Sequence, residues 1–194
     1  MAVYTRISTA ELARALCNFD LRLDGDLQEV ADGIENTTYF FQASSNSDRS
    51  CANASIQPYV LTILENIPVA QMQFSAALCC HLADQGLPVP APLKNSGGLA
   101  AFTLAAKTAL IFPRATGQHP PLITPRHCKT LGEYMARAHS SGQSFPLQLD
   151  NSRGLRWMSA GADALSDHID SRDMSLIHSQ LENYQRLSLG TALP

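Results

Sequence analysis

The sequence predicts an α+β protein whose first part is rich in strands and whose second part is helical. Residues 38–43 and 59–64 are aromatic or β-branched segments of strand length. Prolines and a glycine interrupt any regular pattern within residues 113–121. Beyond residue 124 apolar residues recur at helical spacing. We therefore expect a strand-rich lobe over 1–112, a short hinge at 113–117 and helices over 118–194.

Composition narrows the class of protein. The chain has 194 residues, 45% of them hydrophobic, which allows one large domain or two small ones. The net charge of -3 gives no sign of nucleic-acid binding. The first residues lack the apolar core of a signal peptide, and no apolar run reaches the roughly 20 residues that span a bilayer. We expect a soluble, cytoplasmic protein.

Local signals place the elements of the first part. Ser8 and Glu11 form a capping box that predicts a helix over 8–19. The polar turn before residue 38 leads into one strand, and a long polar connection, 44–58, leads into the return strand of an antiparallel hairpin. Next we expect a helix over 69–85 and an extended, proline-rich connector over 87–92. Two short strands are expected after it, over 99–104 and 108–112.

The second part contains three predicted helices. Thr124 and Pro125 predict a helix start, and Gly142 its end. Two further helices are expected over 157–169 and 174–187.

The five cysteines do not predict a disulfide framework or a zinc site, because their number is odd and no C-x-x-C pair occurs. Cys79, Cys80 and His81 are adjacent, but neighbouring residues of a helix point about 100° apart and cannot easily close on one ion. We interpret them as parts of a packed helix.

Several longer motifs carry a family resemblance. They are GIENTTYF (33–40), YVLTILE (59–65), HLADQGLPVPAP (81–92) and HSSG (139–142) followed by Phe145. In this order they resemble motifs of the homoserine kinases in the aminoglycoside-phosphotransferase-like superfamily, which has a protein-kinase-like fold. The resemblance extends from end to end of the chain. It implies an N-terminal nucleotide-binding lobe and the start of a helical C-terminal lobe.

The resemblance implies transfer of the ATP γ-phosphate to the hydroxyl of L-homoserine, with Mg²⁺ as cofactor, for threonine biosynthesis. Such transfer depends on positioning and charge neutralisation. A glycine at 33 permits close backbone approach, and the polar side chains after it supply donors, whereas the carboxylate of Glu35 would repel phosphate and is expected to brace the loop. The nucleotide-binding residues implied are Gly33, Glu35, Asn36, Thr37, Thr38, Thr62, Phe112 and Arg114.

Two positions depart from the general kinase pattern, one among these residues and one in the hinge. Thr62 stands where many kinase-like proteins carry a phosphate-binding lysine. Positive charge would then come from Lys107 or Arg114, although we expect both to be solvated. Pro113, in the hinge, cannot donate a backbone hydrogen bond to adenine.

No catalytic or metal-binding residue is assigned within this chain. His168-Ile169-Asp170 matches part of the kinase catalytic motif, but Ser175 replaces the expected Asn, so we interpret the match as chance. By resemblance, the catalytic Asp and the metal ligand lie beyond Pro194, and this chain alone is expected to be inactive. His139 is expected to be structural.

Two alternatives remain open. One is another small-alcohol kinase of the superfamily, of choline or aminoglycoside type. The other is a non-catalytic kinase-like binding module. We also expect exposed apolar residues in the last helix, with marginal stability or self-association as the result.

Overall fold

The structure is a computed structural model that describes residues 4–31, 35–46 and 55–190, with side chains in the last helix described up to residue 187. The chain divides into two compact units, residues 1–147 and 148–194, and each is described by itself. Both expected classes of element are present, and the predicted α+β class is confirmed.

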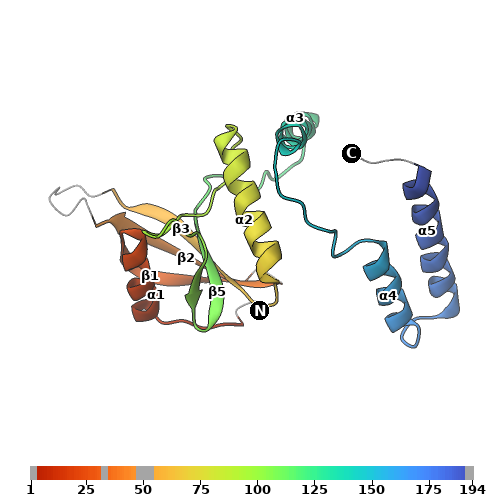
Figure 1. Cartoon of the computed structure of the whole chain (residues 1–194), viewed down its shortest axis with the longest axis horizontal. Coiled ribbons are helices and arrows are strands. Elements are labelled where there is room, and N and C mark those ends of the chain that lie inside the picture. Colours follow the sequence, from red (N-terminus) through yellow and green to blue (C-terminus); the bar gives the residue numbers. More distant parts are fainter. Residues whose placement is uncertain (1–3, 32–34, 47–54, 191–194) are drawn as a thin grey trace. The chain divides into compact units, whose positions relative to one another are not determined.

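The first unit contains a five-stranded antiparallel sheet (Figure 1) in the order β1-β2-β3-β5-β4. The strands are β1 (Leu21–Val30), β2 (Asn36–Ser45), β3 (Gln57–Leu64), β4 (Phe102–Leu104) and β5 (Lys107–Pro113). The predicted hairpin of β2 and β3 is confirmed by pairs from Asn36–Leu64 to Ala43–Gln57. The edge strand β1 was not predicted and pairs with β2.

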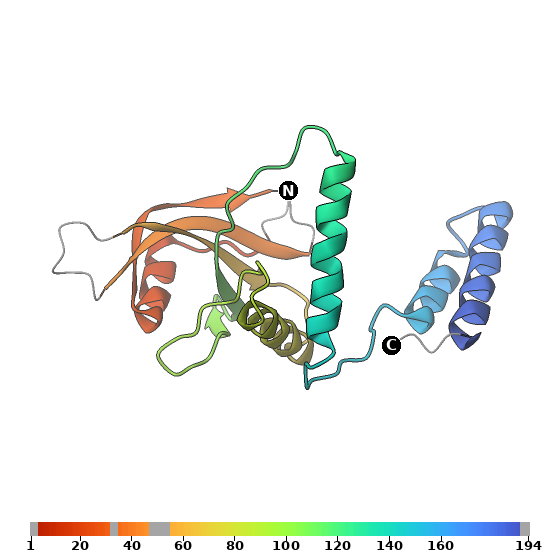
Figure 2. The same cartoon turned by 90° about the horizontal axis from the view of Figure 1, so that it is seen from above.

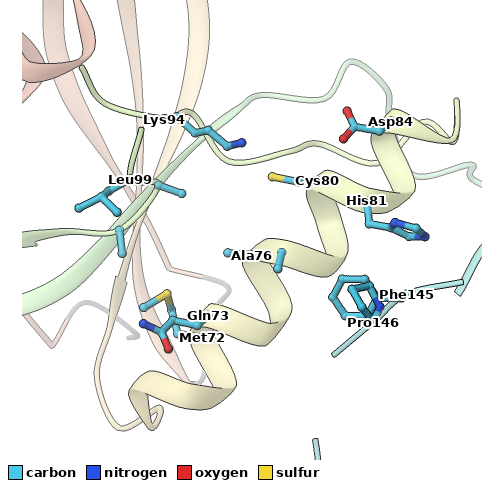
Figure 3. Close-up of a pocket in the computed structure, with 13 residues that line it drawn as sticks. Met72, Gln73, Ala76, Cys80, His81, Asp84, Lys94, Leu99, Phe145 and Pro146 are labelled. Atoms are coloured by element: carbon cyan, nitrogen blue, oxygen red, sulfur yellow. The ribbon is translucent and has the colours of Figure 1, made fainter. Parts of the chain in front are cut away.

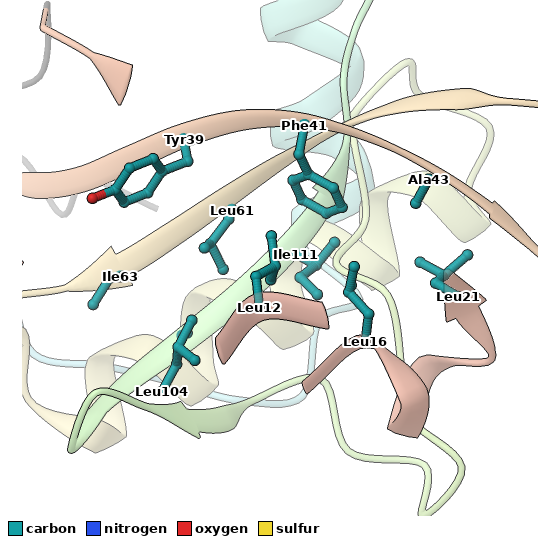
Figure 4. Packing of buried hydrophobic residues seen from close by; sticks show 11 residues of the cluster. Leu12, Leu16, Leu21, Tyr39, Phe41, Ala43, Leu61, Ile63, Leu104 and Ile111 are labelled. Carbon is teal, nitrogen blue, oxygen red and sulfur yellow. The ribbon is translucent and has the colours of Figure 1, made fainter. Parts of the chain in front are cut away.

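One face of the sheet carries the main core. Helix α1 (Thr9–Leu16) begins at the predicted capping box, where Ser8 and Glu11 exchange hydrogen bonds. It continues into one turn of 3-10 helix, Cys17–Phe19. Its buried Leu12 and Leu16 lie on strand residues that all point to this face (Figure 4). Those fully or nearly fully buried residues are Tyr39, Phe41, Ala43, Leu61, Ile63, Ala109 and Ile111.

Helix α2 (Val69–Asp84) covers part of the opposite face, where its buried Met72 packs with Leu64 and Leu110 (Figure 1). Because side chains alternate between the two faces of a strand, Leu64 and Leu110 belong to the face that α1 does not cover. The sheet therefore lies between the two helices.

Helix α3 (Pro125–Gly142) begins as predicted at Thr124 and Pro125. The imidazole Nε2 of His81 on α2 lies 2.9 Å from the carbonyl oxygen of Ser141 at the end of α3. The rings of His81 and Phe74 also contact Phe145, with centroids 5.3 and 5.4 Å away. These contacts join α2 to the end of α3 (Figure 2) within the first unit.

The second unit consists of helices α4 (Leu155–Leu165) and α5 (Ser171–Gly190), both shifted slightly from the predicted ranges. Asp170 precedes α5, and its Oδ1 accepts hydrogen bonds from the N–H groups of Arg172 and Asp173, both 2.9 Å long. Ala162 is the buried residue of this unit among those whose side chains are described. None of the helices in the described parts has the length and hydropathy needed to cross a membrane.

Candidate functional site

The face of the sheet opposite α1 holds most of the residues that the motifs singled out. Thr38 and Phe40 on β2, Thr62 on β3 and Phe112 on β5 alternate with residues of the α1 core, so they share this face. All four are half-buried. Thr62 lies between Thr38 on β2 and Leu110 on β5. We call this surface the inner face.

The two ends of the inner face differ. At one end β2 begins, where Asn36 pairs with Leu64. At the other end Tyr59 pairs with Pro113, the first residue of the predicted hinge. Tyr59 and Leu64 are five residue steps apart along β3, a distance of roughly 17 Å at about 3.3 Å per residue. The predicted phosphate loop and the predicted hinge therefore lie at opposite ends of one strand-lined surface.

A cavity of about 250 Å³ lies at the hinge end, lined by residues of β1, β2 and the start of the hinge. The guanidinium carbon of Arg114 lies 3.8 Å from the centre of the Phe40 ring, a cation–π contact. Arg114 is exposed, as predicted, but this contact fixes its direction toward the ring. The backbone N–H of Arg114 donates to the carbonyl oxygen of Pro58, which anchors the start of the hinge to β3.

Sequence reasoning missed Asp24, which lines the same cavity. Its Oδ1 lies 3.5 Å from the Arg22 guanidinium, while its Oδ2 is buried with no hydrogen-bond partner in the described structure. A buried acceptor without a partner carries a desolvation cost that a ligand donor can relieve. Asp24 reaches this cavity only because β1 pairs with β2, which places it opposite Gln42. A pairing between strands leaves no local motif in the sequence, so Asp24 could not be recognised there.

A buried network occupies the other end of the sheet, on the α1 face. The Glu65 side chain is 5% exposed and pairs with the Lys107 ammonium. The Thr37 hydroxyl donates to Glu65 at 2.6 Å and accepts from the backbone N–H groups of Tyr4 and Thr5 at 2.9 and 3.0 Å. Burial alone would raise the pKa of Glu65, but the hydrogen bonds from Lys107, Thr37 and Thr5 and the Lys107 charge lower it below its ordinary value.

Several of the residues predicted to bind nucleotide lie in or near this network. The Thr37 hydroxyl points away from the inner face and is fully used within the protein. Lys107, which we expected to be solvated, is half-exposed and ion-paired. The Asn36 Oδ1 accepts the Glu65 N–H at 3.4 Å, and Glu35 is exposed. Gly33 lies outside the described residues.

Two of the three histidine-containing motifs contribute structural contacts, whereas His139 is exposed near the end of α3. His81 contacts the end of α3, as described, and Cys79 and Cys80 lie beside it on α2. Burial raises the pKa of the Cys79 thiol. Asp170 of the His168-Ile169-Asp170 triplet caps α5 through its carboxylate. Within the described ranges, no three His, Cys, Asp or Glu side chains come together to hold a metal ion.

A five-stranded antiparallel sheet combined with helices in an α+β arrangement is the fold of protein-kinase-like phosphotransferases. Residues 26–190 match the phosphotransferase enzyme family, and the chain belongs to that family.

Within this family, the chain is similar in sequence to homoserine kinases. The chain is 32% identical over 182 residues to a homoserine kinase of Methylobacillus flagellatus and 32% identical over 181 residues to one of Cupriavidus necator. These alignments cover 94% and 93% of this chain but 54% and 53% of the relatives. The chain thus spans about half the length of the curated relatives it matches.

Solved structures show the same fold. A spectinomycin phosphotransferase in complex with ADP and spectinomycin superposes with a TM-score of 0.65 at 13% identity, covering 98% of this chain and 60% of that one. An amicoumacin kinase in complex with AMP-PNP and Ca²⁺ gives a TM-score of 0.58 at 16% identity, covering 87% of this chain and 49% of that one. Both likenesses concern the fold alone.

Proposed function

We propose that this chain is the nucleotide-binding part of a homoserine kinase, which transfers the ATP γ-phosphate to the hydroxyl of L-homoserine in the cytoplasm for threonine biosynthesis. The observation that supports it most is the end-to-end similarity to homoserine kinases at about one-third identity. The solved structures support the fold, and their low identity favours no other acceptor.

The inner face supports a position for the nucleotide. The base lies in the cavity at the hinge end, against Phe40 and Arg114, and its amino group donates to the free Oδ2 of Asp24. The ribose follows Thr62 and Phe112 along the strands. The phosphates then reach the start of β2, where the Thr38 hydroxyl acts as a donor.

The Thr37 hydroxyl has a different role in this proposal. Since it is already bound to Glu65, it holds the start of β2 in place and makes no contact with phosphate. Glu65 and Lys107 act through the same network. The Lys107 ammonium is therefore paired with Glu65 within the protein. In this proposal Arg114 supplies the cation nearest the nucleotide.

ATP supplies the transferable phosphoryl group, and Mg²⁺ would neutralise its charge. The described residues offer no cluster of metal ligands, so no step through Mg²⁺ is assigned to them. Asp170 caps α5 through its Oδ1, and we assign it this structural role. We therefore propose that this chain binds ATP but does not transfer phosphate by itself.

Calorimetry with ATP tests the nucleotide site. We expect Arg114→Ala to weaken ATP binding roughly tenfold, as loss of a cation worth about 1–2 kcal/mol would produce. Arg126→Ala is the control, because Arg126 is exposed in the first turn of α3, outside the inner face. Equal effects of the two substitutions, or no ATP binding by the unaltered chain, would contradict the site.

A coupled ADP-release assay tests the reaction. With homoserine, ATP and Mg²⁺ the 194-residue chain is expected to show no turnover, and robust turnover would refute its proposed inactivity. In-frame coding DNA after residue 194 that contains His-x-Asp with an Asn five residues after the Asp would support the kinase proposal. A protein extended in this way is then compared on homoserine, choline and an aminoglycoside, and preference for another acceptor would overturn the homoserine assignment.

A further inference from the structure

A second, larger cavity of about 580 Å³ lies between α2 and the segment 94–101, within the first unit (Figure 3). Its floor is one stripe of α2, formed by Met72, Ala76, Cys80 and Asp84 at intervals of four residues. The segment 94–101 forms the facing wall, and Phe145 and Pro146 close another side. None of these residues belongs to the nucleotide site proposed above.

The lining is apolar with two opposite charges near one end. Figure 3 shows the Lys94 ammonium and the Asp84 carboxylate reaching toward the same space, with the Cys80 thiol near them. Both charged side chains are exposed. Within the described residues neither takes part in an ion pair with the other or with a third group. Met72, Ala76 and Leu99 supply the apolar part of the lining.

We propose that this cavity binds a small zwitterion with an apolar side chain, of the α-amino-acid class. An ammonium group on the ligand would meet Asp84 and a carboxylate would meet Lys94, while the side chain would lie on Met72 and Leu99. A simple anion would be repelled by Asp84, and a simple cation by Lys94. The volume lies within the roughly 300–1,000 Å³ of typical small-molecule pockets.

The cavity is connected to the sheet by packing. Met72 lines the cavity and also contacts Leu64 and Leu110, and Phe112 of the inner face packs against the same cluster. A ligand on Met72 would therefore touch the core beneath the proposed ribose position. The cavity is nevertheless a separate site, and its occupation does not depend on the proposed kinase activity.

Calorimetric titration of the chain with L-leucine tests the proposal. N-acetyl-L-leucine lacks the ammonium charge and L-leucinamide lacks the carboxylate, and we expect each to bind about tenfold more weakly than L-leucine. Asp84→Asn should weaken L-leucine binding while leaving the N-acetyl compound unaffected. Lys94→Gln should do the same for L-leucinamide. Both residues are exposed, so these variants are expected to keep the unfolding temperature of the parent chain.

Two controls locate the binding. L-leucine should slow alkylation of Cys80, followed by mass spectrometry, and leave the exposed Cys128 on α3 unchanged. Arg114→Ala should leave L-leucine binding intact while it weakens ATP binding, which separates this site from the nucleotide site. The proposal is overturned if L-leucine does not bind up to about 10 mM. It is also overturned if the capped compounds bind equally well, or if neither charge variant changes the affinity.

Discussion

The sheet unit and the two-helix unit differ in what their apolar side chains contact. In the sheet unit α1 and three strands enclose a core in which Leu12, Leu61 and Ile111 are completely buried. In the two-helix unit the apolar side chains line a groove of about 760 Å³ between α4 and α5, and several remain largely exposed. Those with exposed fractions between 47% and 68% are Trp157, Leu165, Leu176, Tyr184 and Leu187.

This difference teaches that regular secondary structure and stability are separate properties. Helix α5 has 20 residues and a capped start, yet most of the stability of a helix in a protein comes from packing of its apolar face. The sheet unit has shorter elements, but they share a core. We therefore expect the cooperative unfolding transition of the chain to report on the sheet unit.

The largest effect is expected from a core substitution. Leu61→Ala removes a completely buried side chain between α1 and the sheet and should lower the free energy of unfolding by about 2–5 kcal/mol. Leu176→Ala, the same change at a position 59% exposed on α5, should alter it by less than about 0.5 kcal/mol. Urea denaturation followed by circular dichroism measures both. Similar losses would show that the two units share one core.

The second largest change in stability is expected at the buried carboxylate of the sheet unit, Glu65. Glu65→Gln leaves Lys107 without its carboxylate and should destabilise the chain by about 1–3 kcal/mol at neutral pH. Because the pKa of Glu65 is lowered in the folded state, its contribution is complete above the ordinary carboxyl range. It is lost as pH falls through the folded pKa, since the unfolded chain takes up the proton first.

Unfolding measured from neutral to acidic pH tests this sign. The difference between the parent chain and Glu65→Gln should shrink as the pH falls. Glu133→Gln is the matched control, because Glu133 pairs with Lys129 at 3.9 Å on the surface of α3 and both side chains are more than half exposed. Such pairs contribute little. A pH-independent difference for Glu65→Gln would contradict the role of its charge.

Removing a helix cap in each unit also compares the stability of the two units, with smaller expected effects. Ser8→Ala removes the cap of α1, which packs on the main core, and should cost about 1 kcal/mol in the unfolding transition. Asp170→Ala removes the cap of α5 and should lower helical circular dichroism without moving that transition. A shift of the transition by Asp170→Ala would show that α5 unfolds together with the sheet.

The smallest effect has the opposite sign. Ala105 and Ala106 connect β4 to β5 with φ of 50° and 60°, a left-handed conformation that favours glycine and asparagine. Ala106→Gly should therefore stabilise the sheet unit by about 0.5–1 kcal/mol. Ala136→Gly, within α3, should destabilise its helix by about 1 kcal/mol. Thermal unfolding should show a higher unfolding temperature for Ala106→Gly and a lower one for Ala136→Gly. A lower unfolding temperature for Ala106→Gly would exclude strain in this turn.

Sequence signals predicted the fold wherever a pattern was local. The Ser8 capping box, the Thr124 cap and the aromatic strand at 38–43 lie within a few residues of the features they define. Strand β1 was missed because Gly25 and several charged residues interrupt it. Its register with β2 also shifts between Asp24 and Gln28, which breaks the two-residue alternation that would mark a strand.

The site was harder to predict because its contacts join distant residues. Thr37 and Glu65 are 28 residues apart, and Glu65 and Lys107 are 42 apart. Motif similarity drew attention to these segments, but it could not show that the Thr37 hydroxyl is used internally. It also gave no sign of Asp24, which strand pairing brings to the hinge end. The nucleotide contacts of the inner face remain predictions.

The network around Glu65 also affects how the chain folds during synthesis. Tyr4, Thr5, Thr37 and Glu65 leave the ribosome in sequence order, and strands β1 to β3 can pair while β5 is still unmade. Until Lys107 emerges, the Glu65 carboxylate has no cation to accompany it into the interior. We therefore expect this end of the β2–β3 hairpin to stay open to water until β5 has been synthesised.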